Sequence, residues 1–427
     1  IAQDLNEHFA LGFAMAGFAD LTELSLIDAD GDGFVLHARI AEALATGLAP
    51  DDHRATHARL RALFEQRARE ATDGAQAAGA LGRAADHALA DDTVAMADWW
   101  AYWTHLVLGR FSPTRFAALA DRLRRELAQR SPPDERAAAM AAAILGHVRR
   151  AEGDLVAALT CYHDAFERRS TLATRDPSHT GWQRVLSVSH RNIGDVRVAL
   201  GDLAGALSAY EAGLAIAEDL AGRDPSNAGW QRDLSLSHEN IGAVREARGA
   251  LAAALTAYKT GLAIREELAA RDPSNTAWQR DVGAAYDRIG DVRKAQGDLG
   301  ASVHAYEAAK KVAETLAKLD PANADWQRVL SVSHNKVGDA RRALGQLAAA
   351  LAAYEAGLAI REDLAARDSS NTEWQRDLSV SHVKIGNVRV ARGELDAALT
   401  AYDAGRAIAE DLARRDPSNT GWQRDLS

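Results

Sequence analysis

The chain has 427 residues, of which 47% are apolar, 6% aromatic and 26% charged, and its formal net charge is −10. A chain this acidic is a poor general ligand for nucleic acid, because phosphates bind clustered lysine and arginine. No run approaches the ~18 consecutive apolar residues that a membrane span needs. Alanine, the strongest helix former, dominates and favours closely packed helices. The single cysteine, Cys161, excludes an intrachain disulfide and is typical of a reducing, cytoplasmic compartment.

Residues 1–75 predict a short helix–hairpin–helix segment. An amphipathic stretch at 18–26 is followed by I-D-A-D-G-D-G-F-V-L-H at 27–37 and then by A-R-I-A-E-A-L-A. An Asp-Gly pair between two apolar runs is a strong signal for a β-hairpin. The aspartates also match the first half of an EF-hand calcium loop, but the twelfth position of that loop needs a bidentate glutamate and here is Arg39. We therefore expect a turn and no metal site.

This segment is similar, in the order of its elements, to the winged-helix segment of STAND-type NTPases, the class with NB-ARC and NACHT domains. The resemblance implies that His37 contacts the β-phosphate of an ADP held mostly by an upstream domain, although Leu36 and Ala38 replace the Met and Asp of that family's motif. The alternative is a structural histidine at a strand end. The sequence contains no G-x-x-x-x-G-K-[ST] phosphate loop, so this chain alone is not expected to hydrolyse ATP or to need a cofactor.

Residues 76–135 predict a helical connector that includes the run D-W-W-A-Y-W-T-H-L. At helical spacing Trp99, Trp103 and Leu106 share one face, and Trp100 points away from it. Packing against the first repeat is one interpretation of this face. The other interpretation is an aromatic patch that binds a partner.

From residue 136 to residue 427 the sequence repeats every 48 residues. Three residue types recur at this interval: Trp182, Trp230, Trp278, Trp326, Trp374 and Trp422; Gly146, Gly194, Gly242, Gly290, Gly338 and Gly386; Tyr162, Tyr210, Tyr258, Tyr306, Tyr354 and Tyr402. A repeat of this length indicates one supersecondary unit per copy, stacked on its neighbours. We therefore predict six hairpins and the start of a seventh.

Each copy predicts two helices of roughly 20 residues, each ~30 Å long. In one copy, Asn227 is a candidate N-cap, because its side chain can accept a bond from an unpaired amide of the first turn. Gly249 ends the first helix, since glycine adopts the left-handed conformation readily. The second helix ends at Arg271-Asp272-Pro273, because proline disfavours helix in the residue before it. One hairpin cannot bury both apolar faces, so the copies must stack into a superhelix with a concave groove.

The unit resembles a tetratricopeptide repeat. Ile193-Gly194, Ala206 and Tyr210 match the family's Leu-Gly pair, small residue and aromatic residue, and the same frame recurs in the other copies. The copies depart from the family in length, since its repeat is roughly 34 residues. They also replace its two first-helix aromatics with two series: His190, His238, Tyr286, His334 and His382; Arg149, Arg197, Arg245, Arg293, Arg341 and Arg389. The length and the histidine series resemble the long bacterial variant, which often forms the C-terminal part of signalling ATPases. We expect the arginines to pair with acids such as Glu211 and Glu307.

The copies also provide an internal comparison, because positions that are identical in every copy serve stacking whereas positions that vary are free or adapted to a ligand. By the geometry of the family, the varying positions of the first helix face the groove. The residues that we predict to bind a ligand are Arg191, Glu239, Asp287, Asp291, Lys294, Asn335 and Arg342. The alternative is that these positions drift without function in solvent.

The sequence thus predicts an all-α protein: a tetratricopeptide-like α-solenoid of antiparallel hairpins over 136–427, a connector over 76–135 and a winged-helix-like segment over 1–75. We expect no catalytic or metal site. The predicted function is protein or peptide binding, as the ligand-sensing C-terminal region of a bacterial STAND-type signalling ATPase. Two alternatives are a plain assembly scaffold without a nucleotide switch and a repeat domain tethered to a separate effector enzyme.

Overall fold

The computed structural model describes residues 27–30, 33–36, 50–89, 96, 99, 116–129, 134–416, 419 and 421–422. These residues form fifteen α-helices and one two-stranded hairpin. The chain divides into two compact units, Ile1–Val196 and Arg197–Ser427, each of which is described by itself. This boundary falls inside the repeat array, and the predicted boundaries at residues 75 and 135 stay predictions.

The first unit begins with strands β1 (Ile27–Asp30) and β2 (Gly33–Leu36), which pair antiparallel with Ile27 opposite Leu36. Its helices are α4 (Pro50–Glu70), α5 (Gly74–Leu89), α7 (Ala117–Gln129), α8 (Glu135–Ala151), α9 (Leu155–Arg175) and most of α10 (Thr180–Ala199). His37 and the predicted helices that flank the strands lie outside the described residues. The structure therefore supports the all-helical repeat fold but not a winged-helix domain, which stays a prediction.

A core of small and branched apolar residues joins α5, α7 and α8. Leu81, Phe116, Leu123 and Leu127 are buried in it with the alanines of α8. Trp99 packs against this core, and its indole N–H donates to the Glu65 carboxylate at 2.6 Å. The packing interpretation of the aromatic face is therefore confirmed for Trp99. The other two members of that face lie outside the described residues.

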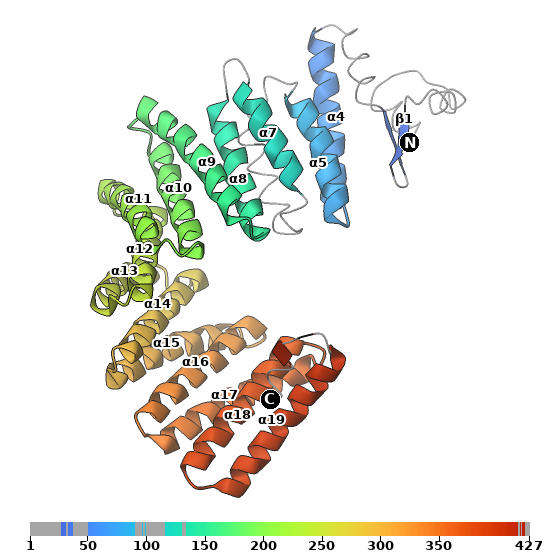
Figure 1. Ribbon diagram of the computed structural model, residues 1–427. Helices are drawn as coiled ribbons and strands as arrows, with labels where there is room; N and C mark the ends of the chain where they lie inside the picture. The colour runs from blue at the N-terminus through green and yellow to red at the C-terminus, as the bar shows by residue number, and fades with distance from the viewer. Residues whose placement is uncertain are drawn as a thin grey trace. The chain divides into compact units, whose positions relative to one another are not determined.

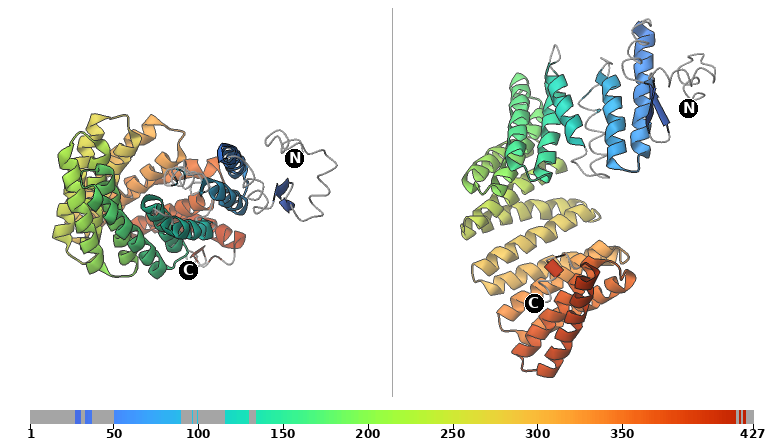
Figure 2. Two further views of the ribbon diagram at one scale, coloured as in Figure 1. Left: turned by 90° about the horizontal axis from the view of Figure 1, so that it is seen from above. Right: turned by 45° about the vertical axis from the view of Figure 1, so that its right-hand side comes forward.

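The second unit is a succession of helical hairpins (Figures 1 and 2). Its helices after α10 are α11 (Leu203–Arg223), α12 (Ala228–Ala247), α13 (Leu251–Arg271), α14 (Thr276–Ala295), α15 (Leu299–Leu319), α16 (Ala324–Ala343), α17 (Leu347–Arg367), α18 (Thr372–Ala391) and α19 (Leu395–Arg415). Within this unit each helix packs on the next one in the chain, from α11 to α19. The hairpins α12–α13, α14–α15, α16–α17 and α18–α19 therefore stack in sequence order, as predicted.

The ends of these helices are set by local interactions. The side chains of Asn227, Asn275, Asn323 and Asn371 accept a hydrogen bond from the tryptophan amide three residues later, at 3.1–3.2 Å. Gly249 ends α12 at a φ of 73°, and its counterparts in the other hairpins are also left-handed. The predicted N-cap and helix stop are both confirmed.

A glycine on the first helix and a tyrosine on the second hold each hairpin together. A Cβ added at Gly290 would lie 2.5 Å from Cε1 of Tyr306, and Gly242, Gly338 and Gly386 have the same relation to their own tyrosines. The same ring also packs on the next hairpin, where Tyr306 meets Val337 and Ala340. The predicted role of the aromatic in filling the space between hairpins is therefore confirmed, and the ring covers the glycine of its own hairpin as well.

We expect Gly290→Ala to destabilise the second unit by about 1–3 kcal/mol, because its methyl group would overlap the Tyr306 ring in a packed core. Gly300→Ala is the matched control, since a Cβ at Gly300 on α15 meets nothing within 4 Å. It should raise stability by up to ~1 kcal/mol through helix propensity. Urea unfolding of both variants measures the difference, and equal stabilities would contradict the steric account.

Candidate functional site

On each first helix of the second unit the varying residues share one side of the helix, and together we call these residues the variable face. Positions three and four residues apart share a side of a helix, and these residues follow that spacing. The face comprises Glu239, Ala243 and Glu246 of α12; Asp287, Asp291 and Lys294 of α14; Asn335, Asp339 and Arg342 of α16; and Val383, Asn387 and Val390 of α18. Arg191 lies on α10 in the first unit.

Ion pairs between successive first helices occupy the predicted acidic residues. Lys336 Nζ of α16 lies 3.4 Å from Asp287 and 3.5 Å from Asp291 of α14. Arg288 of α14 approaches Glu239 of α12 at 3.8 Å. Partly exposed pairs of this kind each stabilise by up to about 1 kcal/mol. The three acids are therefore held by cations of the following hairpin, and sequence reasoning missed those cations.

The pairing continues into the last hairpin, where Lys384 Nζ of α18 donates to both carboxylate oxygens of Asp339 at 2.6 and 2.8 Å. A signal for the missed cations was available in the sequence. Arg288, Lys336 and Lys384 recur at the 48-residue interval, one position before the buried branched residue of each first helix.

In three hairpins the residue after the glycine covered by the tyrosine ring accepts from that tyrosine's hydroxyl, whereas in α12–α13 this residue is Ala243 and the Tyr258 hydroxyl donates to Glu246 at 2.8 Å. Tyr306 donates to Asp291 at 2.6 Å, Tyr354 donates to Asp339 at 2.6 Å, and Tyr402 donates to the Asn387 amide oxygen at 2.8 Å. Burial and this acceptor both raise the pKa of the Tyr306 hydroxyl. Asp291 therefore has a structural role, which makes it a weaker candidate for ligand binding than the sequence suggested.

Asn335 was predicted to face a ligand, but it is buried, with 6% of its surface exposed. Its amide oxygen accepts from both terminal nitrogens of Arg361, at 2.9 and 3.0 Å. Arg361 of α17 is itself buried and donates to the hydroxyls of Ser331 and Ser381 and to the Asp377 carbonyl. Asn335 is thus part of the junction between hairpins, and its placement among residues that face the groove was wrong.

Buried arginines of this kind alternate along the chain. At the position of Arg361, successive copies carry Arg169, Ala217, Arg265, Ala313, Arg361 and Ala409. Arg265 is 3% exposed and donates to the Asp281 carbonyl of the following hairpin and to the Glu239 carboxylate. Arg169 donates to Ser189 at 2.7 Å, and burial lowers its pKa to about 10. Buried guanidinium groups therefore lie at the α13–α14 and α17–α18 junctions, and the partly exposed Arg169 holds the same position on α9. This period of two copies was not predicted from the sequence.

The predicted arginine–acid pairs are present where the copies supply an acid. Arg245 lies 3.3 Å from Glu211 and Arg389 lies 3.4 Å from Glu355, while Arg341 pairs with Glu307. In the intervening copy the acid is replaced by Lys259, and Arg293 instead pairs with Asp298 at 3.2 Å. These arginines therefore bind neighbouring helices and are not ligand contacts.

Solvent reaches a smaller set of residues on the variable face. Lys294 and Arg342 are exposed, as are Val383 and Val390 of α18, which show 41% and 46% of their surface. Helices α12 and α14 together carry six basic and six acidic side chains. Helices α16 and α18 carry seven basic and four acidic side chains, a net charge of +3. Most of these cations are paired with acids, as Lys336, Arg341, Lys384 and Arg389 are, so the exposed part of the face consists of the cations Lys294 and Arg342 and the valines of α18.

The repeated histidines lie in half-buried positions, where burial lowers the pKa of His190, His238, His334 and His382. No group of three or more potential metal ligands occurs within the described residues. None of the helices described is long and apolar enough to cross a membrane.

Comparison with known proteins shows which fold this chain has. No family model and no curated protein sequence matches the chain. Among solved structures, the apo form of RapI superposes with a TM-score of 0.50 at 10% identity, covering 74% of this chain and 76% of that chain. BtubC (BKLC) from P. vanneervenii gives 0.47 at 19% identity, over 60% of this chain and 92% of its own. This chain has a tetratricopeptide-like repeat fold.

A third similar structure is a Signal Transduction ATPase with Numerous Domains (STAND) protein with a tetratricopeptide repeat sensor, from Pyrococcus horikoshii. Its TM-score is 0.45 at 13% identity, and the match covers 98% of this chain and 58% of that chain. Likeness at these identities concerns the fold.

We expect His147→Asn to reduce the loss of stability in acid. Burial lowers the pKa of His147 from 6.5 to about 4. Between these two pH values the unfolded chain therefore binds more protons than the folded chain, so the stability of the fold decreases as the pH drops from about 6.5 towards 4. Asparagine keeps an acceptor for the Tyr162 hydroxyl, which lies 2.8 Å from His147 Nδ1, just as Asn387 accepts from Tyr402.

Thermal unfolding between pH 7.5 and 4.5 measures this effect, with His304→Asn, an exposed position on α15, as the control. The melting temperature of the His147 variant should depend less on pH than that of the parent. Parallel curves for all three proteins would refute the assignment.

Proposed function

We propose that this chain is a non-catalytic scaffold that binds a protein or peptide on its variable face. The observation that carries the proposal is the contrast between the two classes of position in the repeats. The residues that close each hairpin, such as Gly290 and Tyr306, are the same in every copy, whereas the exposed residues of the variable face differ from hairpin to hairpin. Stacking needs only the first class, so the second is free to recognise a ligand.

The ion pairs support this role by ordering the face before a ligand arrives. A surface whose side chains are already held loses less conformational entropy on binding than a mobile one. Glu239, Asp287 and Asp291 then contribute as a fixed background, and direct contacts fall to exposed residues such as Lys294 and Arg342.

The chemistry of the described residues favours binding over catalysis. Cys161 is half-buried, and burial raises the pKa of its thiol, which lowers the thiolate fraction that a nucleophile needs. Its position holds alanine in the later copies, as at Ala209 and Ala257. A small packing residue accounts for it.

The finer proposal is that the chain is the ligand-sensing region of a cytoplasmic STAND-type bacterial ATPase, in which an upstream domain holds ADP or ATP. Its support is the sequence of residues 18–45, with a hairpin at 27–36 and His37 directly after it. The reading frame upstream of Ile1 tests it: a phosphate loop there is expected, and its absence would leave the plain scaffold or a repeat domain joined to another effector.

Selection from a randomised peptide library on the full chain tests the binding function. Lys294→Glu combined with Arg342→Glu should weaken the selected peptides about tenfold or more, because both cations lie on the variable face. Lys311→Glu combined with Lys318→Glu makes the same charge change on α15 and should have little effect. An equal response to both pairs would remove the variable face as the site, and a selection without binders would reject the function.

A further inference from the structure

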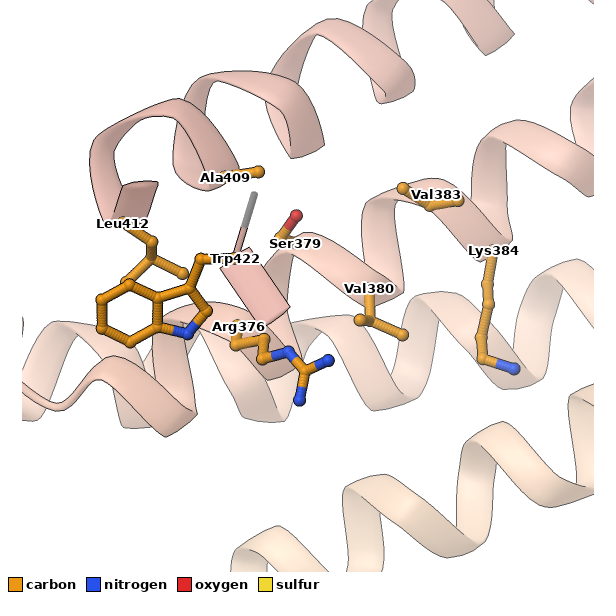
Figure 3. A pocket seen from close by; sticks show the side chains of 8 residues that line it. All are labelled: Arg376, Ser379, Val380, Val383, Lys384, Ala409, Leu412 and Trp422. Atoms are coloured by element: carbon orange, nitrogen blue, oxygen red, sulfur yellow. The ribbon is translucent and has the colours of Figure 1, made fainter. Parts of the chain in front are cut away.

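Each first helix of the second unit carries an arginine near its start, on the same side as an apolar residue one turn later. Figure 3 shows this side of α18, along which Arg376, Val380 and Lys384 follow one another. The spacing of four and three residues continues from this arginine into the variable face, so both belong to one stripe of the helix. The equivalent arginines of the preceding helices are Arg232, Arg280 and Arg328.

In two junctions this arginine is paired with an aspartate of the next first helix. Arg232 Nε of α12 donates to Asp281 of α14 at 2.8 Å, and Arg328 Nε of α16 donates to Asp377 of α18 at 2.8 Å. Each aspartate lies 49 residues after its arginine. An arginine–carboxylate contact between successive first helices is therefore part of the repeat.

The junction between α14 and α16 lacks this aspartate. Val329 stands in its place and is 40% exposed. Arg328 also pairs with Glu373 at 3.0 Å, but the shorter Asp325, which occupies the equivalent position for Arg280, makes no such pair in the part of the chain that the structure describes. Arg280 is thus an exposed cation without an ion-pair or hydrogen-bond partner among the described residues.

Neighbouring helices cover this junction from both sides. Helix α14 packs on α13 and α15, and α16 packs on α15 and α17. In the first unit, where Val185 also replaces the aspartate, the corresponding Arg136 lies 5.7 Å from the centroid of the Trp182 ring. Within the described hairpins Arg280 does not stack on Trp326 in this way. Arg280 is therefore available because an aspartate has been replaced, and not because a hairpin is absent.

The surface next to Arg280 is apolar. By equivalence with Asp281, Val329 lies beside the guanidinium, and Val332 on the same helix is 39% exposed. One turn after Arg280, the exposed Ala284 stands where other copies carry a larger apolar residue. Those larger residues are Val188, Leu236, Val332 and Val380. A carboxylate next to an apolar side chain is complementary to this surface in charge and in polarity.

We propose that Arg280 binds a carboxylate of an extended partner peptide, which takes the place of the missing aspartate, while an apolar side chain of that peptide lies on Ala284, Val329 and Val332. The inference rests on the proposed binding function and names the chemistry of the partner. Four residues of helix separate Arg280 from Ala284 by about 6 Å. In an extended chain, residues two positions apart share a face and lie about 6.6 Å apart. The peptide therefore has an acidic residue two positions from an apolar one.

Parallel selections from a randomised peptide library, on the full chain and on its Val329→Asp variant, test the proposal. Peptides selected on the parent chain should be enriched in an acidic residue two positions from an apolar residue. Val329→Asp restores the aspartate of the other junctions, which should occupy Arg280 as Asp281 occupies Arg232. The enrichment should then disappear. The same enrichment on both proteins, or its absence from the peptides of the parent chain, would overturn the proposal.

Fluorescence anisotropy with one selected peptide measures the contact itself. Arg280→Ala should weaken the peptide about tenfold. Glutamine in place of the acidic residue of the peptide should cost the same factor on the parent chain and nothing further on Arg280→Ala, because the two changes remove one interaction. Additive losses would contradict the pairing.

Two matched variants control for charge. Val156→Asp makes the Val329 change at an exposed position of α9 where the last copy already has Asp396. Arg414→Ala removes an exposed arginine from α19. Both should leave the affinity unchanged. Thermal unfolding followed by circular dichroism should show Val329→Asp to be at least as stable as the parent chain, because it completes an ion pair.

The outcomes separate this inference from the function on which it rests. If selected peptides respond to the variants of Lys294 and Arg342 but not to Val329→Asp or Arg280→Ala, the binding function stands and the site at Arg280 is wrong. If the library gives no binder, both proposals fail.

Discussion

The whole array depends on one close contact, in which the ring of a tyrosine on the second helix of a hairpin lies against a glycine on the first helix, as Tyr306 lies against Gly290. With no Cβ at Gly290, the ring of Tyr306 lies directly on the first helix, and its far side packs on Val337 of the next hairpin. The hydroxyl then bonds the residue that follows the glycine. One side chain thus closes its own hairpin and joins the next, so identical units stack without a shared central core.

Polar interactions are added to this apolar contact at each junction, and they differ from one junction to the next. Between α13 and α14 and between α17 and α18, a buried arginine bonds backbone carbonyls and serines across the junction. Between α15 and α16 the corresponding residue is Ala313, and the junction carries the pairs of Lys336 and Arg341. A guanidinium with several hydrogen bonds fixes the relative register of two hairpins more narrowly than partly exposed ion pairs do.

The buried arginine also decides which residues of the variable face remain available to a ligand. Where the arginine is present, its junction is filled and Asn335 or Glu239 is committed to it. Where alanine replaces it, as at Ala313, the junction is held instead by ion pairs such as that of Lys336 with Asp287. Departures from the repeat, and not the repeat itself, are therefore the places to look for a partner. This agrees with the general finding that a shared fold leaves function to particular sites.

The sequence by itself determined the hairpins, because their limits are set by local chemistry: an asparagine cap, a left-handed glycine and an aspartate-proline stop each act within a few residues of the helix end that they set. It also predicted the glycine–tyrosine frame, which repetition makes visible. Only the tertiary structure decided which varying residues remain available. Asp287 is held by Lys336, Asn335 is buried on Arg361, and Val383 is open to solvent, yet all three occupy one repeat position. Whether each side chain is available depends on contacts with neighbouring helices that are tens of residues away in the sequence. Such contacts exist only once the hairpins have stacked.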